Sequence, residues 1–185
     1  RWRERFGVNF RLQAVPLPNG LANAWRDLDR PGMAGLGASF RYRPLTWFAL
    51  DIGLDGFGGI DYSGHERVEG ALSTSGLFYL NPQHRVQAYV LAGLHVASAE
   101  VRPESYRPNL SRQGYADEYA YFGGQGGVGV EFRVSRRIGI PIDGMVVART
   151  RIDDGVLPEF LDPRTGETGN ASVGGVLRAG LTVWW

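Results

Sequence analysis

The chain has 185 residues, enough for one domain with a core, and its 20 Lys and Arg nearly balance its 19 Asp and Glu. This balance argues against nucleic acid as a partner, and the absence of cysteine excludes disulfides and thiolate metal sites. Glycine accounts for 27 residues, about twice its usual share of ~7%. No apolar run approaches the ~18–20 residues of a membrane-spanning helix. We treat residues 1–185 as a single domain.

Eight segments alternate apolar residues with small or polar ones, which is the period of a β-strand. In chain order they cover 5–15, 33–43, 47–56, 67–80, 86–97, 120–134, 138–150 and 173–185. The phase of 67–80 is ambiguous, because Leu77 and Tyr79 compete with Phe78 and Leu80 for its apolar face.

The connections between these segments alternate in length. Short turns at 44–46, 81–85 and 135–137 alternate with long connections at 16–32, 57–66, 98–119 and 151–172. This alternation is typical of an up-and-down meander. Membrane barrels show the same asymmetry, with short periplasmic turns and long extracellular loops.

The two faces of the segments differ sharply in charge. The apolar face carries no charged residue, whereas the other face combines many glycines with six arginines and five acids. Nearly matched charges suit an enclosed interior, because a buried unpaired charge is very costly. Aromatic residues lie near the segment ends, where we expect two interfacial girdles. The girdle candidates are Tyr42, Trp47, Phe48, Phe78, Tyr79, Tyr121, Phe122, Trp184 and Trp185.

These patterns predict an all-β fold, an eight-stranded antiparallel up-and-down transmembrane β-barrel with its apolar face toward lipid. Segment 173–185 closes the barrel against 5–15. Eight strands leave room only for side chains, so we expect a filled, non-conducting interior, with Trp184, Tyr79 and Leu91 beside the charged side chains. We expect Glu131 and Asp143 to pair with arginines among Arg11, Arg41, Arg149 and Arg178. The predicted interior charge network is Arg11, Arg41, Asp51, Glu69, Glu131, Arg133, Asp143, Arg149 and Arg178.

The segments "ALSTSGLFYLNPQHRVQAYVLAGLHV" and "GGQGGVGVEFRVSRRIGIPIDGMV" resemble the barrel domain of the OmpA-like eight-stranded outer-membrane family. The final residues Leu181, Val183 and Trp185 are similar to the C-terminal signal that the barrel-assembly machinery of such proteins reads. The resemblance implies a location in the bacterial outer membrane with both termini in the periplasm, and contact with outer-membrane lipids. It implies no specific chemistry.

Two other interpretations of the sequence remain open. His95 and Ser98 suggest a lipid-modifying enzyme similar to outer-membrane lipid A deacylases. There, however, the two residues lie two apart, and a spacing of three puts them on opposite faces unless a bulge intervenes. A soluble lipocalin-like barrel would instead place the apolar face inside. We expect no catalytic, cofactor-binding or metal-binding residues, and therefore not an enzyme.

The long segment 98–119 mixes arginine and tyrosine, which are favoured at interfaces. We expect a structural or interaction scaffold, a subunit of a cell-envelope complex, with recognition carried by the extracellular loops. Lipopolysaccharide phosphates and other envelope proteins are the candidate partners, and nucleic acid is not. The loop candidates for contact are Arg102, Tyr106, Arg107, Arg112 and Tyr115.

Overall fold

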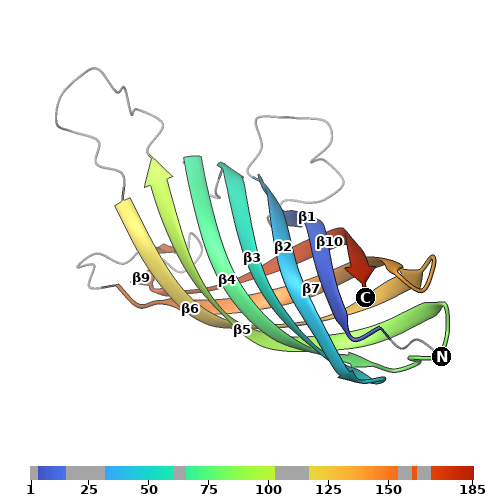
Figure 1. Cartoon of the computed structure of the whole chain (residues 1–185). Coiled ribbons are helices and arrows are strands. Elements are labelled where there is room, and N and C mark those ends of the chain that lie inside the picture. Colours follow the sequence, from blue (N-terminus) through green and yellow to red (C-terminus); the bar gives the residue numbers. More distant parts are fainter. Residues whose placement is uncertain (1–3, 16–31, 61–65, 103–116, 154–159, 162–167) are drawn as a thin grey trace.

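The computed structural model describes residues 4–15, 32–60, 66–102, 117–153, 160–161 and 168–185. Eight long strands in these ranges form one closed barrel, in which each strand is antiparallel to both of its neighbours (Figure 1). The last long strand pairs with the first, with Val8 opposite Val183. The predicted all-β, up-and-down, eight-stranded barrel is therefore confirmed. Its strands are β1 (Phe6–Val15), β2 (Gly32–Leu45), β3 (Phe48–Ile60), β4 (Glu66–Tyr79), β5 (Val86–Arg102), β6 (Asp117–Arg133), β7 (Ile138–Arg151) and β10 (Ala171–Trp184).

Two further short strands lie between β7 and β10. β8 (Phe160–Leu161) and β9 (Thr168–Gly169) pair with each other in a separate two-stranded sheet. The sequence alone placed this stretch in a loop, because strands of two residues leave no alternating pattern to detect. In the part of the chain that the structure describes, no helix is long and apolar enough to cross a membrane.

The apolar face lies on the outside of the barrel. Leu12, Leu54 and Val128 are each between 64% and 66% exposed, although all three are large and apolar. The ambiguous phase of β4 is also settled, because Phe78 and Leu80 face outward while Leu77 and Tyr79 are buried. This inside-out distribution contradicts the soluble lipocalin-like alternative, which requires the apolar side chains inside.

Several strands continue further than the alternating pattern predicted. β3 extends to Ile60, β5 to Arg102, and β6 begins at Asp117. Beyond the apolar stretch, outward positions of β4, β5 and β6 carry charged residues, and Glu100 forms an ion pair of 2.7 Å with Arg102. Alternation ends here because outward side chains no longer face hydrocarbon. This charged row marks one edge of the apolar belt and comprises Glu66, Glu100, Arg102 and Glu118.

The opposite edge of the belt lies at the short turns. Arg85, Arg136 and Arg137 are exposed there, and the backbone N–H of Arg5 donates to the carbonyl of Trp185 at 3.1 Å, so the two ends of the described barrel are adjacent. On β4, the outward apolar positions run from Val68 to Phe78. This span is about 33 Å of strand, or about 25 Å of height at a tilt of about 40°, which matches the apolar band of a membrane barrel.

The predicted aromatic girdles need a correction. Tyr79, Tyr121 and Trp184 are at most 3% exposed and lie inside the barrel, because each shares the inward phase of its strand. For Tyr79 and Trp184 this confirms the expected filling of the interior, and none of the three belongs to a girdle. An outward girdle does form at the turn end. Two ring groups make it up, Phe6 with Phe40, Tyr42 and Trp185, and Trp47 with Phe48 and Phe78.

Candidate functional site in the barrel interior

Glu131 is the centre of an ion cluster that fills the turn-side half of the barrel. Its carboxylate, 0% exposed, accepts hydrogen bonds from Arg41 at 3.1 Å and from Arg133 at 3.0 Å. The hydroxyl of Tyr79 donates to the same carboxylate at 3.3 Å. Trp184 lies 4.8 Å beneath the guanidinium of Arg133. Glu131 therefore holds together residues from β2, β4 and β6.

A second carboxylate, Asp51 on β3, continues the cluster across the barrel. It pairs with Arg41 at 2.6 Å and with Arg11 at 3.3 Å, and the Ser39 hydroxyl donates to it at 2.9 Å. Arg11 also donates to Asp55 through Nε at 2.8 Å and Nη2 at 2.6 Å. Each of these buried charges therefore has an opposite partner, which burial of ions requires.

Asp143 on β7 forms a neighbouring ion group, which adjoins the cluster through the rings of Tyr79 and Tyr89, whose centroids are 5.5 Å apart. Arg178, directly opposite on β10, donates to it at 2.5 Å, and the Tyr89 hydroxyl donates at 2.7 Å. Leu77 and Leu91 fill the space beside these groups. The turn-side half of the lumen is thus packed with paired ions, aromatic rings and aliphatic side chains.

The outer half of the interior has its own ion cluster around Glu69. Glu69 accepts from Arg67 at 3.1 Å and also pairs with Arg149. The Tyr121 hydroxyl accepts a hydrogen bond from Arg67 at 2.8 Å, while the guanidinium of Arg149 lies 4.2 Å above the Tyr121 ring. The structure therefore separates the nine network candidates into two groups, with Glu69 and Arg149 in the outer one.

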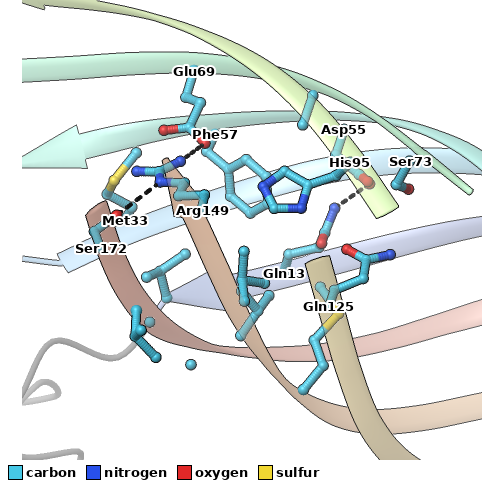
Figure 2. A pocket seen from close by; sticks show the side chains of 18 of the residues that line it. Gln13, Met33, Asp55, Phe57, Glu69, Ser73, His95, Gln125, Arg149 and Ser172 are labelled. Atoms are coloured by element: carbon cyan, nitrogen blue, oxygen red, sulfur yellow. Dashed lines mark hydrogen bonds and ion pairs between the residues drawn. The ribbon is translucent and has the colours of Figure 1, made fainter. Parts of the chain in front are cut away.

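A cavity of about 250 Å³ lies between these two clusters. His95 points into it from β5, with Gln13 and Asp55 on one side and Arg149 on the other (Figure 2). Its apolar lining includes Phe57, and both methionines of the chain also contribute. The expected complete filling of the interior therefore holds only for the turn-side half.

His95 and Ser98 do not meet. His95 faces the interior and is 7% exposed, whereas Ser98 faces outward and is exposed. The registers of β5 with β4 and with β6 run without a bulge through this stretch, so the three-residue spacing keeps the two side chains on opposite faces. The pairing on which the deacylase alternative depended is absent. Among the described residues, no cluster of His, Asp and Glu is arranged to hold a metal ion.

The remaining candidates fall outside the interior. Leu181, Val183 and Trp185 face outward at the end of β10. Arg102 is exposed at the end of β5. The loop candidates Tyr106, Arg107, Arg112 and Tyr115 lie outside the described residues.

Several interior residues escaped the sequence analysis. Arg67 shares the inward phase of Glu69 and was detectable by that phase alone. Gln13, Gln87 and Gln125 are also buried in the interior, and a neutral amide carries no charge by which the sequence would indicate an interior partner.

A closed eight-stranded barrel with an apolar outer belt and a paired ionic interior defines the class of small outer-membrane β-barrels, and this chain has that fold. The comparisons with known proteins agree. The chain is similar to Neisserial surface protein A (NspA), with 14% identity, 97% of each chain covered and a TM-score of 0.63. It is also similar to a major outer membrane protein from Thermus thermophilus, with 12% identity, 99% of this chain and 100% of the other covered, and a TM-score of 0.59.

A third similar structure is Ail, the attachment invasion locus protein of Yersinia pestis, in complex with the heparin analogue sucrose octasulfate. It has 12% identity and a TM-score of 0.54, with 98% of this chain and 97% of the other covered. No family model matches the chain, and no curated protein matches its sequence. At these identities the similarity establishes the fold, which agrees with the resemblance seen in the sequence.

Proposed function

We propose that this chain is a bacterial outer-membrane barrel that does not conduct and that serves as an interaction scaffold, as a subunit of a cell-envelope complex. The observation that carries the non-conducting role is the ion cluster around Glu131 and Asp51, together with the neighbouring ion group at Asp143. They join strands across the whole turn-side lumen through contacts of 2.5–3.3 Å. An open water path would have to separate these paired ions.

Planar bilayer recording tests this role. Purified protein is expected to give no steady conductance under an applied voltage. The double variant Asp51→Asn/Glu131→Gln removes two of the carboxylates that hold the arginines across the lumen, and we expect it to give transient openings. A large steady conductance of the unaltered protein would overturn the proposal.

The proposed orientation places both termini and the short turns in the periplasm. It is supported by the adjacency of the two ends and by the short turns on that side, as in membrane barrels generally. We further propose that Leu181, Val183 and Trp185 engage the barrel-assembly machinery during insertion. Trp185→Ala is expected to lower the yield of heat-modifiable protein in the outer membrane. Phe132 is another outward aromatic residue near the turns, so Phe132→Ala serves as the control. Its yield of heat-modifiable protein should be higher than that of Trp185→Ala.

Recognition is proposed to reside on the extracellular side, in contact with lipopolysaccharide phosphates. The guanidinium of Arg102 lies beyond the apolar belt, with its side chain 45% exposed, and Arg107, Arg112, Tyr106 and Tyr115 follow it in the chain. The Ail complex with sucrose octasulfate shows that a barrel of this fold can hold a polyanionic saccharide. The triple variant Arg102→Gln/Arg107→Gln/Arg112→Gln should weaken binding to lipopolysaccharide vesicles, and binding that is unchanged would refute this role.

The enzymatic alternative has no support from the interior geometry. If the purified protein and its Ser98→Ala variant both deacylated lipid A, the catalytic residues would have to differ from the pair His95 and Ser98. The expected result is no deacylation by either protein.

A further inference from the structure

The cavity in the outer half of the barrel has the properties of a small-molecule site. Its volume of about 250 Å³ exceeds the ~150 Å³ of a cavity that holds benzene. Phe57, Met33 and Met145 supply an apolar wall, while His95, Gln13 and Gln125 supply polar groups. Binding pockets typically combine a mostly apolar lining with a few polar groups that orient the ligand.

Each charged group of the lining already has a partner, although two arginines share the carboxylate of Glu69 and leave one positive charge in excess. Asp55 pairs with Arg11 at 2.6 Å, and Glu69 pairs with Arg67 and Arg149. A cation would enter without a counter-ion and would lose its hydration, which is costly. An anion would have to displace Arg149 from Glu69 and from the Ser172 hydroxyl, to which its Nε donates at 3.2 Å. The cavity therefore favours a neutral ligand.

Two polar side chains of the lining retain hydrogen-bonding capacity. Nδ1 of His95 is buried and has no hydrogen-bond partner among the residues that the structure describes, and the residue is only 7% exposed. The amide of Gln13 is oriented by Asp55, which accepts from its Nε2, so Gln13 presents an oxygen that also lacks a described partner. Buried polar groups are normally satisfied, which makes these two informative.

We propose that this cavity binds a small neutral amphiphile, an aromatic or aliphatic body carrying a hydroxyl group, with the hydroxyl at His95 and the body against Phe57, Met33 and Met145. A hydroxyl both donates and accepts, so it can satisfy the imidazole in either tautomer. The ion cluster of the turn-side half forms the closed floor of the site.

The chain offers a direct readout, because Met33 and Met145 are its only methionines and both line the cavity. Protein labelled with ¹³C at the methionine methyl groups therefore gives two signals, and both report on the site. Titration with 1-naphthol in bilayer nanodiscs is expected to shift both signals saturably. Naphthalene, which lacks the hydroxyl, should bind about two- to tenfold more weakly.

Gly174 provides the cavity-filling variant. It lines the cavity from β10, and a Cβ built there meets no atom within 4 Å. Gly174→Leu should occupy the space without a clash and abolish the saturable shift. Gly70→Leu is the matched control, because Gly70 faces outward, also with no atom within 4 Å of a built Cβ, and it should bind 1-naphthol as the unaltered protein does.

His95→Leu tests the polar contact separately. It should remove the preference for 1-naphthol over naphthalene while leaving the binding of naphthalene. The proposal is overturned if the unaltered protein shows no saturable shift, if Gly174→Leu shifts equally, or if the preference survives in His95→Leu. None of these results depends on whether the barrel conducts ions, so the binding test and the conductance test can fail separately.

Discussion

Replacing Glu131 by glutamine tests whether paired burial of charge stabilises the barrel interior. The substitution keeps the shape of the side chain and removes its charge. Arg133 then loses the carboxylate 3.0 Å away, and Arg41 keeps its partner Asp51. Removing one partner of a buried ion pair costs about 3–5 kcal/mol. Glutamine can still accept one hydrogen bond, so we expect the lower end of this range, about 3 kcal/mol of unfolding free energy.

The same substitution at the barrel surface provides the control. Glu100 pairs with Arg102 at 2.7 Å, a distance similar to that in the buried pair, but these side chains are 40% and 45% exposed. Glu100→Gln should therefore cost less than about 1 kcal/mol. Urea unfolding in lipid vesicles, followed by tryptophan fluorescence, measures both variants.

A double variant separates pairing from packing. In Glu131→Gln/Arg133→Gln the two amides can bond to each other and no charge remains between them. Its cost should fall below the sum of the single variants by about 1 kcal/mol or more. If Glu131→Gln costs no more than Glu100→Gln, then the interior pairs do not stabilise the fold and the reasoning fails.

Three further predictions concern packing, depth and pH. Gly127→Ala should destabilise the barrel by about 1–3 kcal/mol, because a Cβ at this position would lie 2.2 Å from the backbone oxygen of Gly144. Gly126→Ala is the control and should be nearly neutral, because its Cβ would lie 3.7 Å from the nearest atom. Urea titration compares the unfolding free energies of the two variants. Leu72→Arg, near mid-height of the outer belt, should cost about 2–4 kcal/mol, and Val68→Arg, at its edge, about 0–1 kcal/mol; equal costs would contradict the assigned membrane position. At the end of β7, a hydrogen bond from Arg151 lowers the pKa of Asp153 to about 2. This contact should therefore stabilise the folded state above about pH 4 and weaken as the pH falls toward 2. Carboxyl NMR should show the pKa of Asp153 returning toward ~3.9 in an Arg151→Gln variant.

Sequence periodicity predicted the strands well only where they face lipid. β5 was expected to end at 97, yet it continues to Arg102. From Ser98 onward its outward residues are polar, because they leave the hydrocarbon and no longer need to be apolar. Strand length beyond the membrane therefore has no alternating signal, and the backbone pairing that continues there is visible only in the structure.

Ion partners were predictable to different degrees for a related reason. Arg178 and Asp143 are directly opposite on adjacent strands, as are Arg41 and Asp51, so a correct register suffices to pair them. The contact between Arg41 and Glu131 instead crosses the lumen from β2 to β6. It depends on strand tilt and barrel diameter, and neither quantity is encoded in the period of any one strand.

For the aromatic residues, the position in the alternating pattern of the strand predicts which face the side chain occupies, whereas the residue type does not. Trp184 and Trp185 are adjacent and chemically identical, yet the first is 0% exposed beneath Arg133 and the second is 55% exposed in the girdle. Because successive side chains point to opposite faces, the apolar Val183 already assigns Trp185 to the lipid and Trp184 to the interior. The terminal pair therefore has two separate roles, and replacing Trp184 by alanine should disturb the ion cluster, whereas replacing Trp185 should not.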